Sequence, residues 1–311
     1  MPIKIGLALS GGGARGLAHI GVLKVLEETQ VPVHMLAGTS MGGIIASAYA
    51  AGRTAADLDD LANSIRLLDI AQRDRSGMGL LGQGKIVKRL EEVLGGDLTF
   101  DQLSLPLALV AVDLGTGEEV ILREGSVIEA VLATTAVPIV FPPVTWEGRV
   151  LADGGLLNPV PFDVVRHMGA DRVVAVHTMH DLGGSPGVPG PTSGSGIEAV
   201  LRTLMYRTPW APVMDVAERS QAIMSRQLVE HRLEQDPPDV MIRVPLKGVG
   251  LLDLDQVNRC IQAGEDAARR FVPEFTRLYE ASQPNLLARW WRSLVDRGQR
   301  PPEGEAEESD V

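Results

Sequence analysis

Short apolar runs alternate with stretches of helical periodicity along most of this chain. Residues 3–9 and 33–37 are apolar and of strand length, whereas residues 17–28 and 42–51 repeat apolar positions at helical spacing. The second helical stretch stops at Gly52. This order of strand, helix, strand and helix is typical of a mostly parallel sheet that is covered by helices.

The alternation continues beyond residue 100 and predicts an α/β fold. Further strands are expected at 107–112, 119–122, 149–152, 172–177 and 240–244, and further helices at 55–67, 85–94, 126–134, 162–168 and 255–279. Two segments break the pattern. Residues 67–84 hold four glycines and are predicted to form a surface loop that could act as a lid. Residues 183–196 are almost entirely Gly, Pro and Ser, which predicts a flexible insertion.

The composition narrows the class of protein. A chain of 311 residues that is 45% hydrophobic and 22% charged can bury a large α/β core. Its formal net charge of -11 argues against nucleic acid as a partner. Cys260 is the only cysteine, so a disulfide within the chain is excluded, and a reducing, cytoplasmic location is expected. No run of 18 apolar residues and no signal-peptide core is found, so neither a membrane span nor export is expected.

The pentapeptide Gly38-Thr39-Ser40-Met41-Gly42 lies between an expected strand and an expected helix. This is the context of a nucleophile elbow, a sharp turn that exposes one hydroxyl at a helix N-terminus. Glycines at 38 and 42 suit a turn in which a Cβ atom would be crowded. We therefore predict that Ser40 is a nucleophile.

A second glycine cluster follows the first strand, with Gly11, Gly12, Gly13, Arg15 and Gly16. Its backbone amides and the helix after it predict an anion site. One interpretation is an oxyanion hole for acyl transfer. Another is a dinucleotide site, since Gly11, Gly13 and Gly16 match the dinucleotide-binding fingerprint. That fingerprint also expects an acidic residue about 20 residues further on, and the sequence has none at the end of the second expected strand. A plain turn is the third.

A serine nucleophile needs a base. His177 and His180, at a strand end, are candidates, whereas the other four histidines are expected to be structural or solvated. Asp153 also ends an expected strand, and Gly154 and Gly155 let the chain turn away from it. An Asp-Gly pair is equally a common turn signal.

Three motifs in this order resemble the patatin-like phospholipases of bacteria, in particular the small members related to neuropathy target esterase: GGGARG at 11–16, GTSMG at 38–42 and DGG at 153–155. The resemblance covers roughly residues 3–280. It implies a three-layer α/β/α fold with a mostly parallel sheet and a Ser40–Asp153 dyad. It also implies an oxyanion hole from the amides of 11–13, support of that loop by Arg15, and no metal or cofactor. The implied substrate is a phospholipid, a lysophospholipid or a related lipid ester.

The family often has glycine where Ile139 stands, and the 183–196 insertion is unusual for it. The resemblance therefore does not define the shape of the acyl pocket. We expect an acyl hydrolase domain at 1–282, a short amphipathic helix at 283–298 and a disordered acidic tail at 299–311. The Trp- and Arg-containing stretch 286–295 suits either peripheral membrane contact or packing on the domain. A nucleotide-binding regulatory protein and a Ser-His-Asp esterase remain the alternatives.

Overall fold

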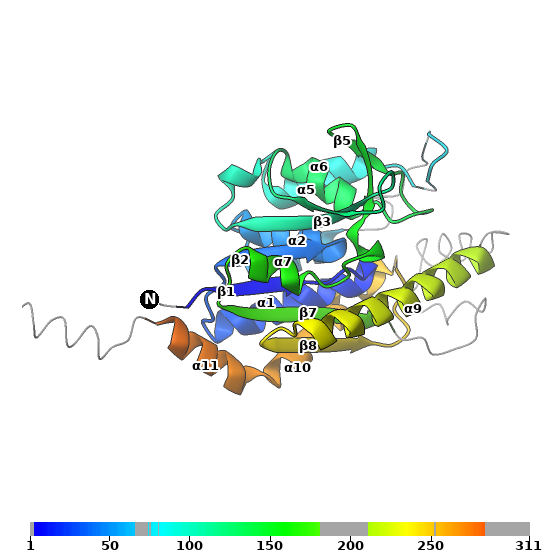
Figure 1. Cartoon of the computed structure of the whole chain (residues 1–311). Coiled ribbons are helices and arrows are strands. Elements are labelled where there is room, and N and C mark those ends of the chain that lie inside the picture. The colour runs from blue at the N-terminus through cyan, green and yellow to red at the C-terminus, as the bar shows by residue number, and fades with distance from the viewer. Residues whose placement is uncertain are drawn as a thin grey trace, which may run out of the picture.

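An eight-stranded, mostly parallel sheet forms the middle of the molecule (Figure 1). The computed structural model describes residues 3–65, 74, 76–79, 81–180, 211–251 and 253–283. The strand order is β5-β6-β3-β2-β1-β7-β8, with β4 also paired to β3. The strands are β1 (Ile5–Leu9), β2 (Met35–Thr39), β3 (Leu107–Asp113), β4 (Glu119–Leu122), β5 (Val144–Trp146), β6 (Arg149–Asp153), β7 (Arg172–His180) and β8 (Val240–Leu246). Four pairs of neighbouring strands are parallel: β3 with β2, β2 with β1, β1 with β7, and β7 with β8. Three pairs are antiparallel: β3 with β4, β3 with β6, and β5 with β6.

Helices cover both faces of the sheet, because alternate residues of each strand point to opposite sides. In β1, Ile5, Leu7 and Leu9 join the larger hydrophobic core, whereas Ala8 joins the smaller one. The larger core packs against α1 (Ala18–Glu28), α2 (Met41–Ala50), α3 (Ala55–Ser64), α5 (Gly84–Leu94), α6 (Val127–Thr134), α10 (Val257–Arg269) and α11 (Val272–Ser282). The smaller core packs against α7 (Phe162–His167) and α9 (Ala211–Gln235). The predicted three-layer α/β/α architecture is confirmed.

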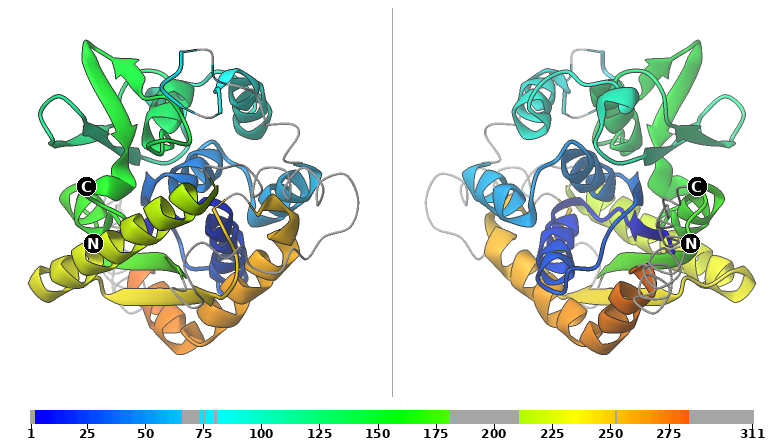
Figure 2. Two further views of the ribbon diagram at one scale, coloured as in Figure 1. Left: turned by 90° about the vertical axis from the view of Figure 1, so that its right-hand side faces the viewer. Right: turned by 90° about the vertical axis from the view of Figure 1, so that its left-hand side faces the viewer.

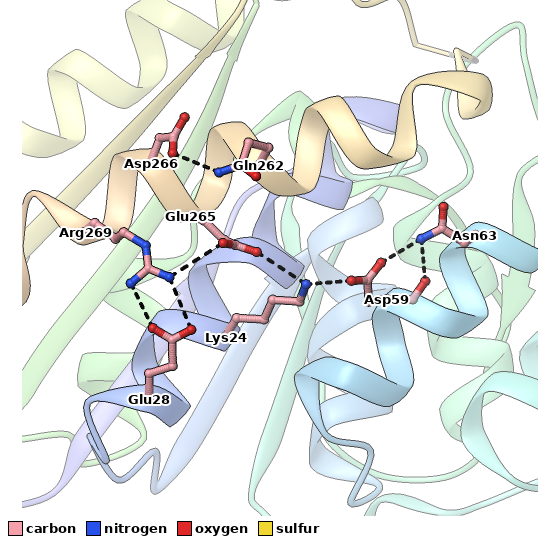
Figure 3. A network of polar contacts seen from close by, with 8 residues as sticks. All are labelled: Lys24, Glu28, Asp59, Asn63, Gln262, Glu265, Asp266 and Arg269. Carbon is pink, nitrogen blue, oxygen red and sulfur yellow. Dashed lines mark hydrogen bonds and ion pairs between the residues drawn. The ribbon is translucent and has the colours of Figure 1, made fainter.

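Ion pairs tie together the outer surfaces of α1, α3 and α10 (Figure 3). Lys24 of α1 contacts Asp59 of α3 at 2.6 Å and Glu265 of α10 at 3.3 Å. These carboxylates raise the pKa of Lys24. Arg269 of α10 pairs with Glu28 at 2.9 Å. This side of the larger core is therefore covered by a charged surface.

Three elements differ from the sequence expectation. The single helix expected at 255–279 is two helices, α10 and α11, because Pro273 occupies the first turn of α11 and has no N–H to continue a helix through it. The short strand β5 and the 25-residue helix α9 were not predicted. Half of the expected lid at 67–84 (residues 67–73, 75 and 80), the insertion at 183–196 and residues 284–311 lie outside the described residues.

Candidate active site

Ser40 sits in the sharp turn between β2 and α2. Its backbone angles, φ 53° and ψ -125°, are in a region that residues with a side chain rarely adopt, and its N–H donates to the hydroxyl of Thr134 at 2.9 Å. A Cβ atom at position 38 would lie 2.6 Å from the Gly43 Cα, and one at position 42 would lie 2.3 Å from the Leu9 carbonyl oxygen. Glycine is therefore required at both positions, and the predicted elbow geometry is present.

Asp153 is the last residue of β6, and it pairs with Ala111 in the middle of the sheet. Its side chain is only 2% exposed. One carboxyl oxygen, Oδ1, accepts a hydrogen bond from the Gly155 N–H at 2.7 Å. The other, Oδ2, is buried and has no hydrogen-bond partner of standard geometry among the described residues.

Burial controls the proton affinity of this carboxyl. Removal from water raises the pKa of Asp153 to about 6, and this effect outweighs the lowering by the Ser40 side chain and by the Gly155 N–H. The Ser40 hydroxyl is thus close enough to Asp153 to act on its pKa. The sequence places these residues 113 positions apart, and the fold brings them together in one pocket of about 100 Å³.

The glycine loop lines the same pocket, at the exit of β1. A Cβ atom on Gly11 would lie 3.3 Å from the Ser40 Cβ, so the loop and the elbow are in contact. The Gly11 N–H already donates to the Pro159 carbonyl at 3.1 Å. The amides of Gly12 and Gly13 donate to no described residue outside the 3-10 helix Gly13–Leu17, which begins here. Of the three amides expected to form an oxyanion hole, those of Gly12 and Gly13 therefore have no backbone acceptor outside this helix among the described residues.

Arg15 follows the glycine loop, is buried and also lines the pocket. Its guanidinium donates to the Val249 carbonyl at 2.7 Å and to the Glu218 carboxylate of α9 at 3.2 Å. A guanidinium that holds a backbone carbonyl and a carboxylate fixes the loops that bear them. This geometry agrees with the expected role in loop support. Nearby Gly16 is packed tightly, since a Cβ atom there would lie 2.5 Å from the Met41 Cγ.

Among the described side chains, no histidine has a hydrogen bond to Ser40. His19 is fully buried, and its Nε2 hydrogen-bonds the Ser10 carbonyl at 2.8 Å. His177 lines the pocket, but burial lowers its pKa to about 4, so it is neutral near pH 7. The side chain of His180 lies outside the described residues.

Sequence reasoning missed several residues that shape the site. Thr178 of β7 donates its hydroxyl to the Gly11 carbonyl at 2.9 Å, and Thr134 of α6 holds the Ser40 N–H. Helix α9 closes the pocket, and its lining residues are Glu218, Gln221, Ala222, Ser225 and Arg226. None of these residues belongs to a sequence motif, because the packing of elements that are distant in sequence brings them to the site, and no local pattern marks them.

No group of three or more His, Cys, Asp or Glu side chains that could hold a metal ion occurs within the described ranges. Within the same ranges, no helix combines the length and the apolar character that crossing a bilayer requires. The groups around Ser40 in this pocket include its hydroxyl, a carboxyl of raised pKa and the backbone amides of the glycine loop.

Comparisons with known proteins identify the family of this chain. A family model described as patatin-like phospholipase matches residues 7–166. An uncharacterized NTE family protein of Mycobacterium tuberculosis is 34% identical over 211 residues, which is 66% of this chain and 56% of the relative. Patatin-like phospholipase domain-containing protein 6 of Mus musculus is 32% identical over 233 residues, or 71% of this chain and 16% of the relative. The chain spans little more than half of the first relative and a small part of the second.

The crystal structure of VipD from Legionella pneumophila shares the fold, with a TM-score of 0.56 at 15% sequence identity, over 88% of this chain and 67% of that one. A parallel sheet with helices on both faces and a serine elbow at a strand end defines the class of three-layer α/β proteins with a nucleophile elbow. The family model covers more than half of the chain, and so the chain belongs to the patatin-like phospholipase family.

Proposed function

We propose that this protein is a serine acyl hydrolase that cleaves the carboxylic ester bonds of phospholipids, lysophospholipids or related lipids. The observation that carries the proposal is the buried Oδ2 of Asp153, which has no hydrogen-bond partner of standard geometry among the described residues and lies with the Ser40 hydroxyl in the pocket that the glycine loop lines. Membership of the patatin-like phospholipase family supports a lipid ester as the substrate. No step requires a cofactor.

In the first half-reaction, the Ser40 oxygen attacks the ester carbonyl carbon while its proton passes to Asp153 Oδ2. The carbonyl oxygen becomes an oxyanion, which accepts hydrogen bonds from the Gly12 and Gly13 amides. The bond to the alcohol then breaks, and the proton on Asp153 goes to the departing alkoxide. An acyl-enzyme on Ser40 remains.

In the second half-reaction, a water molecule attacks the acyl carbon and gives its proton to Asp153. The tetrahedral intermediate collapses, the carboxylic acid leaves, and Ser40 recovers its proton. A carboxylate with a pKa of about 6 accepts protons more readily than one near the usual value of about 3.9, yet it is still ionised at pH 7. Burial therefore makes Asp153 suitable as a direct base.

Steady-state kinetics on a p-nitrophenyl ester and on a phospholipid test the proposal, with Ser40→Ala, Asp153→Asn and a matched control. The control is Asp113→Asn, because Asp113 is also buried and also accepts a hydrogen bond from the glycine N–H two residues on, at 2.8 Å, but does not line the pocket. We expect the first two variants to lose at least about 1,000-fold in kcat, as removal of a triad member does. Asp113→Asn should retain kcat within a few-fold.

Two results would overturn the proposal. One is hydrolysis by Asp153→Asn at the wild-type rate. The other is an inactive wild-type protein that binds a nucleotide at the glycine loop, which would favour the regulatory alternative.

A further inference from the structure

Seven large apolar side chains of the described residues are exposed to solvent, and all of them lie at one end of the molecule. Their exposed fractions run from 43% to 59%, and they are Met78, Leu114, Ile139, Val150, Val216, Ile223 and Met224. This end holds the carboxyl ends of the parallel strands, where Ser40 follows β2. It faces the viewer in the left view of Figure 2, with α9 crossing it. We refer to these seven residues as the apolar rim.

Helix α9 contributes the part of the apolar rim that is nearest to the pocket. Ile223 and Met224 are exposed, whereas their neighbours Ala222 and Ser225 line the pocket. Val216 lies two turns before Ile223 and is also exposed. The helix therefore has one side on the pocket, and its exposed side carries these three apolar residues beside the polar residues Ser220 and Gln227.

The segment after α6 contributes the opposite side of the pocket mouth. Val137 lines the pocket, and Ile139 projects from the same segment. Ile139 has a φ of 72°, in the left-handed region that disfavours a β-branched residue. Met78 lies beside this segment, because its neighbour Gly79 packs against the backbone of Phe141. An exposed isoleucine in a backbone conformation suited to glycine indicates that its apolar side chain has a use.

Leu114 and Val150 extend the apolar rim along the sheet. Leu114 directly follows β3, and its N–H donates to the Val150 carbonyl at 2.8 Å. Since β3 runs parallel to β2, both residues lie at the end of the sheet where the serine elbow is. The outer surface of α1, α3 and α10 instead bears the ion pairs of Figure 3. Among the described residues, the large exposed apolar side chains are therefore at the end of the sheet that bears the site, and not on the outer surface of α1, α3 and α10.

The pocket is too small for a lipid in the observed arrangement. Its volume of about 100 Å³ is well below the roughly 300–1,000 Å³ of sites that enclose drug-sized ligands. Helix α9 forms one wall of the pocket, so an outward movement of α9 would enlarge the pocket and carry the exposed side chains of Ile223 and Met224 with it. A surface that contacts this wall from outside would meet these two apolar side chains.

We infer that the apolar rim docks on a zwitterionic phospholipid surface, so that α9 meets the lipid at the mouth of the pocket. This inference rests on the proposed function, which supplies the lipid substrate. The net charge of -11 disfavours attraction to an anionic surface, so apolar contact rather than charge provides the affinity. Binding should therefore be insensitive to salt.

The test is co-sedimentation of the full chain with phosphatidylcholine vesicles, in a Ser40→Ala background so that no lipid is hydrolysed. The double substitution Ile223→Gln and Met224→Gln removes two apolar groups without a change of charge, and it should weaken binding at least tenfold. Gln227→Ala, one turn further along α9 at another exposed position, is the matched control and should bind as the parent does. Ile139→Gly should also weaken binding without loss of thermal stability, since it relieves the strained backbone.

Activity separates this inference from the proposed function. With Ser40 restored, the Ile223/Met224 variant should hydrolyse a soluble short-chain ester within twofold of wild type and vesicle phospholipid at least tenfold more slowly. Unchanged vesicle binding in both rim variants overturns the inference, as does binding that is lost only when residues 285–311 are deleted. A wild-type dimer that the rim variants convert to a monomer, with no vesicle binding, would assign the face to a second copy instead. Vesicle binding by a protein that hydrolyses no ester would leave this surface in place and reject the proposed function.

Discussion

At the scale of single residues, the environment of Asp153 determines what the site can do. The sequence left open whether burial or hydrogen bonds would set its proton affinity. The structure shows that burial prevails, because only one oxygen, Oδ1, is held by a backbone amide, whereas Oδ2 has no standard partner among the described residues. A buried carboxyl that lies beside a hydroxyl and has a raised pKa is suited to accept a proton from that hydroxyl.

The pKa of Asp153 predicts how the rate depends on pH. The carboxyl must be ionised to act as a base, so kcat/KM for a soluble ester should rise with pH, with a midpoint near 6, and level off above it. His177 has a pKa lowered to about 4 and stays neutral over this range. His177→Gln should therefore keep the same midpoint. A midpoint that disappears in this variant would favour the Ser-His-Asp alternative.

At the scale of elements, β7 orients the glycine loop that follows β1. The Gly11 carbonyl accepts hydrogen bonds from Thr178 Oγ1 at 2.9 Å and from Ser10 Oγ at 3.0 Å. The C=O and N–H of a trans peptide point in opposite directions, so this contact turns the Gly12 N–H away from β7. Thr178 thus acts as a positioning residue for one anion donor.

Removal of the Thr178 hydroxyl should impair the chemical step more than binding. We expect Thr178→Val, which has a similar volume, to lower kcat for a soluble ester about tenfold with KM nearly unchanged, since Ser10 still holds the Gly11 carbonyl. Thr178→Ser should restore kcat, because it keeps the hydroxyl. Equal losses in both variants, or a loss that follows thermal stability, would mean that Thr178 has only a packing role.

The elements also show how far the sequence could predict this site. Ser40, Asp153 and the glycine loop each follow an apolar strand and carry a local turn signal, so their positions could be predicted. Thr178 could not, because its partner lies 167 positions away and the contact depends on the pairing of β1 with β7. Helix α9 was missed because it buries few apolar side chains, Val229 among them, and lacks a strong helical period.

At the scale of the whole molecule, the nucleophile, the pocket and the exposed apolar side chains share one end, and ion pairs cover the outer surface of α1, α3 and α10. Arg15, next to the glycine loop, donates hydrogen bonds to Glu218 of α9 and to the Val249 carbonyl. A shift of α9 would therefore displace Arg15 and the loop beside it. Such an arrangement suits a protein that contacts a lipid surface with the end that bears the pocket.

The proposed chemistry depends on Ser40 as the nucleophile, and covalent labelling tests this role most directly. The 311-residue chain is treated with a fluorophosphonate, and the adduct is located by mass spectrometry of its peptides. We expect one adduct, on Ser40, that is absent from Ser40→Ala and forms much more slowly in Asp153→Asn than in Asp113→Asn. An adduct on another residue, or ester hydrolysis that persists in Ser40→Ala, would contradict the account.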